Sequence, residues 1–325
     1  MIWLTWRQLR ASAVAVYALV AALCVAFLVT ARPSEPVLDG LQDLLYNQGT
    51  ISAVYLLPAL IGVFWGAPMV ARELEAGTHR LVWNQSVTRS RWLATKLAVA
   101  GLAAAAAAGL YSLVVTWWTA PGEGKGLTMA LNSTGRITPF LFSVRGLVPV
   151  GYAVFALVLG VVIGVLLRRT VAAMAAALAI YIAVQILMPL FVRPHLIPPV
   201  QQTVAITAEN TVSVGFTGPE ATQVTSIKVR EPEGAWILTD ETVDATGAKV
   251  DSLAAGLGNC PPPSPGVNMM DCYAKAASDH GYRQLLEYQP AGRFWALQTL
   301  ETAIFLALSG LLTWLCFRLV RHRVS

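Results

Sequence analysis

Five long apolar windows without any Asp, Glu, Lys or Arg, and a sixth with a single acid, constrain what this chain can fold into. They span residues 11–31, 44–71, 97–122, 146–167, 170–192 and, with Glu301 inside it, 294–317. A helix that crosses a bilayer needs about 20 mostly apolar residues. Only 13% of the chain is charged, against about 25% in a soluble domain. The sequence therefore predicts an α-helical polytopic membrane protein. Its six transmembrane helices are expected near residues 11–31, 51–71, 94–118, 146–167, 171–192 and 295–317.

The basic residues predict the orientation of these helices. If the N-terminus is cytoplasmic, the short inner segments hold Arg7, Arg10, Arg72, Arg80, Arg89, Arg91, Lys96, Arg168, Arg169, Arg318, Arg321 and Arg323. Only two acids, Glu73 and Glu75, accompany them. Because short loops rich in Lys and Arg stay inside, we expect both termini in the cytoplasm of a multi-pass protein. The pI near 9.1 then reflects topology, and no nucleic acid partner is expected.

The first helix has a second interpretation. Val29-Thr30-Ala31 also fits a signal-peptidase site, with Arg7 and Arg10 as the charged flank. The apolar run before that site is about 20 residues long, however, which exceeds the usual ~7–15 of a signal sequence. We therefore expect the helix to be retained. Cleavage would leave the orientation of the other helices unchanged.

Residues 193–293 differ from the rest and predict a small mixed α/β domain outside the cytoplasm, between the fifth and sixth helices. Alternating apolar and polar residues predict four strands, at 202–207, 211–216, 225–231 and 235–240. Residues 269–288 predict a helix interrupted near Gly281. Cys260 and Cys272 both fall in this segment, where an outer location permits a disulfide; two unpaired thiols are the alternative.

No catalytic motif is recognisable in the chain. The sequence PGEGKGLT at 121–128 departs from a phosphate-binding loop because Lys125 is followed by Gly126 rather than Ser or Thr. We find neither a metal-ligand spacing nor a nucleophile motif, so we expect no catalytic residue, no metal site and no cofactor in this chain. The sequence does not predict an enzyme.

Three polar residues lie inside the expected helices: Gln185, Gln298 and Glu301. Glu301 follows Arg293 by about 12 Å of helix, which places it within the hydrocarbon, where an acid is a functional candidate. Gln298 and Thr302 share its face. Either these residues form a hydrogen-bonded cluster between helices, with Gln185 as a member, or Glu301 contacts a substrate or a gate.

The segment 66–97 is the charged stretch between the second and third helices. Gly77 suits the left-handed turn that ends a helix, and we expect a short helical hairpin below the bilayer. Basic residues there can serve as a topology signal alone. That explanation does not account for Glu73 and Glu75.

The same segment resembles the first cytoplasmic loop of ABC-2 type transporter permeases. The matching positions are an acid at Glu73, Gly77-Thr78, the turn Ser86-Val87-Thr88-Arg89 and Lys96; Gln85 departs from the proline that is frequent in the family. The resemblance implies a permease subunit in a bacterial cytoplasmic membrane, organised as 1–192 (helices one to five, with a coupling loop at 72–92), 193–293 (the outer domain) and 294–325 (helix six and a basic tail). The coupling residues it implies are Arg72, Glu73, Glu75, Gly77, Thr78 and Arg89.

The resemblance also implies partners and an activity. The loop would dock on a dimeric cytoplasmic ABC ATPase that uses ATP and Mg²⁺, and a second copy or a sister permease would complete an exporter in the lipid bilayer for a drug or a lipid. Two other functions remain open at this stage. The chain could be an ion-coupled secondary transporter that uses Glu301, or a membrane-anchored sensor or scaffold whose outer domain binds a ligand.

Overall fold

The computed structural model describes residues 2–30, 56–78, 88–119, 135–217, 223–250, 260 and 269–322. The chain divides into two compact units. The first comprises Met1–Asn132, Pro139–Leu196 and Phe294–Ser325, and the second comprises Ser133–Thr138 and Ile197–Arg293.

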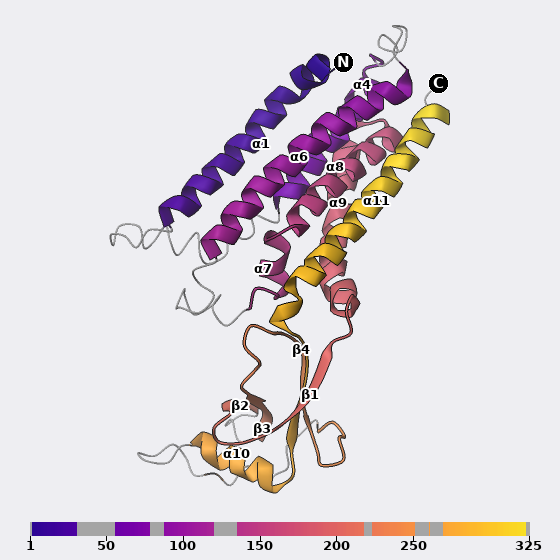
Figure 1. Ribbon diagram of the computed structural model, residues 1–325. Coiled ribbons are helices and arrows are strands. Elements are labelled where there is room, and N and C mark those ends of the chain that lie inside the picture. Colours follow the sequence, from indigo (N-terminus) through magenta and orange to yellow (C-terminus); the bar gives the residue numbers. More distant parts are fainter. Residues whose placement is uncertain are drawn as a thin grey trace. The chain divides into compact units, whose positions relative to one another are not determined.

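The first unit is a bundle of long helices (Figure 1). Its elements are α1 (Ile2–Thr30), the π-helix η2 (Ile61–Gly66), α4 (Ala67–Glu75), α6 (Arg89–Thr119), α7 (Pro139–Val144), α8 (Val148–Leu167), α9 (Thr170–Leu187), the π-helix η4 (Met188–Val192), the 3-10 turn η5 (Arg193–His195) and α11 (Phe294–His322). In the part of the chain that the structure describes, four helices are long and apolar enough to cross a membrane. They are Arg89–Trp117, Val148–Leu167, Thr170–His195 and Ala291–His322, and Ser12–Val25 is a shorter apolar helix.

The expected second span is seen only in part. Residues 56–60 are α-helical and lead directly into η2 and α4, whereas residues 51–55 lie outside the described part of the chain. The mostly helical, membrane-type character of the chain is therefore established, and the count of six spans stays a prediction.

Helix α8 is the central helix of the bundle, and it packs very closely on η2 and α4. Its residues from Val148 to Val165 are buried, apart from two partly buried valines. A Cβ atom added to Gly160 would lie 2.3 Å from the carbonyl oxygen of Gly62, and one added to Gly66 would lie 2.4 Å from that of Leu157. The Gly-x-x-x-Gly spacings at 62–66 and 160–164 thus face each other, and close backbone contact takes the place of side-chain packing.

One end of the bundle gathers the basic residues, and we call it the basic end. There α4 ends at Glu75, α6 begins at Arg89, α8 ends at Leu167, α9 begins at Thr170 and α11 ends at His322. Figure 1 shows that both chain termini also lie at this end. The side of the membrane that this end faces stays a prediction.

The second unit contains two small sheets and one helix. Strands β1 (Val200–Ala205), β5 (Arg283–Gln289) and β4 (Trp236–Val243) form an antiparallel sheet in the order β1-β5-β4. Strands β2 (Thr211–Thr217) and β3 (Gln223–Val229) form a separate antiparallel pair, and α10 spans Met269–Asp279. The helix predicted at 269–288 is wrong beyond Gly281. This glycine follows the end of α10 and has a φ of 75°, in the left-handed region. The residues after it pair with both β1 and β4.

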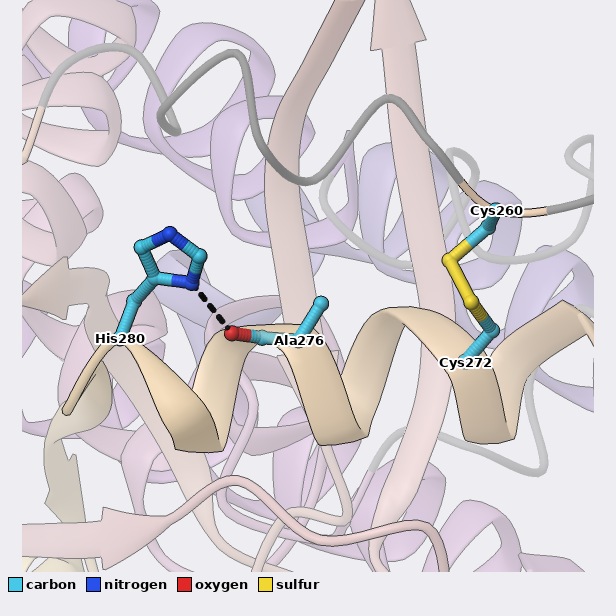
Figure 2. The surroundings of a disulfide bond; sticks show 4 residues. All are labelled: Cys260, Cys272, Ala276 and His280. Atoms are coloured by element: carbon cyan, nitrogen blue, oxygen red, sulfur yellow. Dashed lines mark hydrogen bonds between the residues drawn. A yellow bond between two sulfur atoms is a disulfide. The ribbon is translucent and has the colours of Figure 1, made fainter.

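The core of this unit joins its helix to both sheets. Tyr273, Ala274 and Ala277 of α10 are buried in one cluster with Ile227 of β3 and Leu286 of β5. A disulfide between Cys260 and Cys272 attaches the preceding loop to α10, as Figure 2 shows. At the other end of the same helix, Nδ1 of His280 donates to the carbonyl oxygen of Ala276 over 2.7 Å. The second unit is therefore a small α/β arrangement, and its side of the membrane stays a prediction.

Candidate functional site

At the basic end, Glu73 joins α4 to α6. Nζ of Lys96 donates to Oε1 of Glu73 over 2.5 Å and to the carbonyl oxygen of Met69 over 3.2 Å. The Glu73 and Lys96 side chains are only 13% and 5% exposed. The Lys96 ammonium also lies 4.7 Å from the centre of the Trp92 ring, a favourable cation–π distance. Because little water reaches this ion pair, it is screened less than a surface pair.

The second acid, Glu75, joins α4 to α9. Its Oε2 accepts from the Thr170 hydroxyl over 2.7 Å and from the Thr170 backbone N–H over 3.0 Å. Thr170 is the first residue of α9, so Glu75 caps a helix N-terminus from another element, where a negative charge is favourable. These hydrogen bonds, the side-chain one first, lower the pKa of Glu75, and the nearby Arg169 charge adds to the effect.

The other residues expected to couple lie around these contacts. The side chain of Arg72 is exposed, and its carbonyl oxygen accepts from the Ala76 N–H that closes α4. Gly77 has a φ of 69°, so the predicted left-handed turn is present, and Thr78 after it is exposed. Arg89 begins α6. Residues 79–87, which carry the tip of the expected hairpin, lie outside the described part of the chain.

This geometry changes the interpretation of the two acids. We expected Glu73 and Glu75 to be presented to a partner below the bilayer, whereas the structure directs them to Lys96 and Thr170 of the same chain. The pairing explains why acids occur in an otherwise basic region. They fasten the end of α4 to two neighbouring helices, and the exposed side chain of Arg72 is the better placed for a partner.

At the opposite end of the bundle, Glu301 belongs to a buried polar cluster, which we call the Arg193 cluster. Nε of Arg193 donates to Oε2 of Glu301 over 2.7 Å, and Nη2 donates to Oε1 over 2.9 Å. The Tyr152 hydroxyl donates to Oε1 as well. Arg193 also donates to the Ser143 hydroxyl over 2.8 Å and to the Pro139 carbonyl oxygen over 2.9 Å. The Arg193 and Glu301 side chains are fully buried, at 0% exposure.

Sequence reasoning missed Arg193, which it placed in the outer segment. A signal was present, because Arg193 directly follows the fifth expected helix and Glu301 lies near the start of the sixth. Consecutive membrane-spanning helices run in opposite directions. The end of one helix therefore lies at about the same depth in the membrane as the start of the next. Opposite charges at equal depth in neighbouring helices suggest a pair.

Gln185 and Gln298 do not join Glu301 in the single hydrogen-bonded cluster that the sequence suggested. Oε1 of Gln298 accepts from the backbone N–H groups of Leu147 and Val148, both over 2.9 Å, so it caps the N-terminus of α8. Its Nε2 donates to the Phe142 carbonyl oxygen over 2.9 Å. Gln185 instead donates to the Tyr181 hydroxyl of its own helix over 2.7 Å. Gln298 and Glu301 therefore lie one turn apart but bind separate groups, and Gln185 hydrogen-bonds elsewhere.

Neither arrangement presents a group poised for bond-making chemistry. The Glu301 carboxylate is held by Arg193 and Tyr152, and the acids of the basic end hold helices together. Among the residues that the structure describes, no group of three or more His, Cys, Asp or Glu side chains is placed to hold a metal ion. The arrangement fixes helices to one another.

Comparison with known proteins gave one match. A family model described as ABC-2 membrane transporter related matches residues 9–193, more than half of the chain. The match includes α4, α6 and the segment between them, and it ends at Arg193. Neither the curated proteins nor the solved structures contain a match.

Proposed function

Because the chain belongs to the ABC-2 membrane transporter related family, we propose that it is the permease subunit of an ATP-driven ABC-2 type exporter. It forms half of a translocation pathway with six spans in a bacterial cytoplasmic membrane. A second copy or a sister permease forms the other half. A separate dimeric ATPase binds segment 72–92 and hydrolyses ATP with Mg²⁺. The exported compound is a drug or a lipid.

The observation that supports this proposal most directly is the double attachment of α4. The Glu73–Lys96 pair fastens the end of α4 to α6, and the Glu75–Thr170 contact fastens it to α9. The backbone of the same segment also packs on α8, since a Cβ on Gly164 would lie 2.7 Å from the Ala67 carbonyl oxygen. A partner that displaces segment 72–92 therefore moves α4, α6, α8 and α9 together.

Ion-coupled transport through Glu301 is less well supported. A coupling carboxylate has to exchange its ion or proton during each cycle. Glu301 is held by two hydrogen bonds from Arg193 and one from Tyr152, so the arginine already neutralises its charge. A sensor or scaffold would differ from the exporter in needing no ATPase partner.

A charge-exchange series at the basic end tests the proposal. Glu73→Lys places a second cation beside Lys96, so we expect it to separate α4 from α6 and to uncouple ATP hydrolysis from export. The double variant Glu73→Lys/Lys96→Glu restores an ion pair and should recover export. Arg72→Glu leaves the pair intact and should weaken co-purification of the ATPase, because reversing an exposed charge at a docking surface creates a repulsive contact. The measurements are ATPase co-purification and substrate-stimulated ATP hydrolysis in liposomes.

Arg230→Glu is the matched control, because this exposed arginine carries the same charge and belongs to the second unit. It should leave ATPase binding unchanged. A double variant that stays defective while its thermal stability is restored would show that Glu73 itself contacts the ATPase. Failure of any ATPase to associate with the wild-type protein would exclude the exporter in favour of a sensor or scaffold.

A further inference from the structure

The final helix, α11, has a buried face and an exposed face. Its buried face carries Glu301, Phe305, Ser309, Cys316 and Val320. The opposite face carries Leu311, Trp314, Arg318 and His322, spaced three or four residues apart and therefore aligned, and all four are exposed. Leu311 and Trp314 are 59% and 57% exposed. This second face belongs to none of the contacts described above.

The exposed face changes from apolar to cationic within about 16 Å of helix. Leu311 comes first, then Trp314, and the basic side chains follow. The Arg318 guanidinium lies 5.6 Å from the centre of the Trp314 ring. Tryptophan favours the boundary between acyl chains and headgroups, and arginine extends its charge toward the polar side. The order of chemical groups along this face is that of a phospholipid, from acyl chain to phosphate.

A second helix contributes to the same place. Nε of Arg321 donates to the Ser90 hydroxyl of α6 over 3.2 Å, which holds Arg321 where α6 and α11 meet. A guanidinium has five N–H donors, so further donors remain for phosphate oxygens. Arg91, next to Ser90, is exposed. Neither α6 nor the part of α11 after Glu301 contains an acid, and the acids of α4 are bonded to Lys96 and Thr170.

We propose that Leu311, Trp314, Arg318 and Arg321 form a binding site for an anionic phospholipid of the leaflet at the basic end. The excess of basic over acidic residues on α6 and this part of α11 favours an anionic headgroup over a zwitterionic one. A topology signal requires only basic residues near a helix end; it does not require them to continue an exposed apolar face. An acidic protein partner would meet Arg321 but would leave the deeper Leu311 and Trp314 uncovered. The proposal does not depend on transport.

The test uses the full-length protein and lipids of matched acyl chains. Native mass spectrometry should show tighter retention of phosphatidylglycerol than of phosphatidylcholine. The double variant Arg318→Gln/Arg321→Gln should weaken phosphatidylglycerol binding by roughly tenfold or more, given the contribution of each basic residue near an anionic surface, and leave phosphatidylcholine binding unchanged. Arg230→Gln/Arg283→Gln removes the same charge from exposed positions of the second unit and should bind both lipids as the wild type does.

The wild type provides an independent measurement that needs no folded variant. Its preference for phosphatidylglycerol over phosphatidylcholine should fall as salt is raised, because exposed charges are screened. Equal binding of the two lipids by the wild type would overturn the proposal. So would an equal loss in both double variants, which would indicate net charge alone. A loss of ATPase binding with unchanged lipid binding in Arg318→Gln/Arg321→Gln would assign this face to the protein partner instead.

Discussion

At the scale of single residues, two ion pairs with little exposure, Glu73–Lys96 and Arg193–Glu301, join helices of this protein. Isolated, a charged side chain at the centre of a bilayer costs about 2.5–3.5 kcal/mol on insertion scales. Arg193 and Glu301 offset that cost for each other, and the hydroxyl groups of Ser143 and Tyr152 satisfy further hydrogen bonds. Each charge therefore depends on the other, because either one alone would be buried without an opposite charge beside it.

The first prediction is a double-variant cycle on this pair. Arg193→Gln or Glu301→Gln leaves one buried charge without its partner, and breaking a buried pair in this way costs about 3–5 kcal/mol. The double variant removes both charges and should be more stable than either single variant. Thermal unfolding in detergent measures the effect. Strictly additive losses would show that the two side chains do not depend on each other.

The second prediction concerns Glu75 and pH. Hydrogen bonds from Thr170 lower its folded-state pKa below the ordinary value of 4.5. A carboxyl whose pKa is depressed by folding stabilises the fold above its unfolded pKa, and the contribution is lost as the pH falls through the folded pKa. Wild type should therefore unfold at a higher temperature than Glu75→Gln near neutral pH, and the difference should vanish at acidic pH below the folded pKa. A difference that persists there would assign the effect to packing.

At the scale of elements, the contact of η2 and α4 with α8 organises the bundle. Four glycines, Gly62, Gly66, Gly160 and Gly164, allow backbones to approach so closely that a single added Cβ meets backbone atoms. Backbone atoms cannot rotate away as a flexible side chain can. The contact is therefore specific for glycine.

The third prediction follows from this contact. Gly160→Ala places a Cβ 2.3 Å from the Gly62 carbonyl oxygen, so the helices have to move apart, and overpacking of this kind costs about 1–3 kcal/mol. Gly310→Ala in α11 is the matched control, because nothing lies within 4 Å of its added Cβ; alanine should be tolerated or slightly stabilising there. Thermal unfolding of both variants is the measurement. Equal unfolding temperatures for the two would contradict the close packing.

At the scale of the whole molecule, one chain supplies two units of different chemistry. It leaves the helical unit at Leu196 and returns to it at Phe294. Within the helical unit, Arg193 lies just before the exit in the sequence and Glu301 lies just after the return. The second unit has its own core and its own disulfide, so it is stabilised independently of the bundle.

The fourth prediction concerns the second unit and its location. A digest without reductant should contain the Cys260 and Cys272 peptides linked, and protease added to intact cells should cleave this unit. Cys260→Ser/Cys272→Ser should destabilise the unit by about 3 kcal/mol, as expected for a cross-link that closes a short loop. Cys24→Ser is the control, since Cys24 carries no disulfide. Free thiols at both positions would exclude the cross-link, and protection from protease would exclude the outer location.

The sequence by itself determined the membrane character, the family and the approximate positions of the helices. These follow from composition, from the absence of charge over long windows and from a local motif at 72–97, and all three are readable along the chain. Strands β1 to β4 also follow from local alternation. Beyond Gly281 the local sequence did not predict the strand β5. Arg283–Gln289 becomes a strand through its pairing with β1 and β4.

Only the tertiary structure decided what the charged and polar side chains bind. Glu73 and Lys96 are 23 residues apart, and Arg193 and Glu301 are 108 residues apart. Sequence periodicity places a side chain on a face of its own helix, but it does not specify which helix that face meets. Glu73, which we inferred to dock on a partner, is thus bonded to Lys96 of the same chain. Glu301, which we expected without a charged partner, is bonded to Arg193. Helix packing fixes these partners, and it depends on the whole bundle at once.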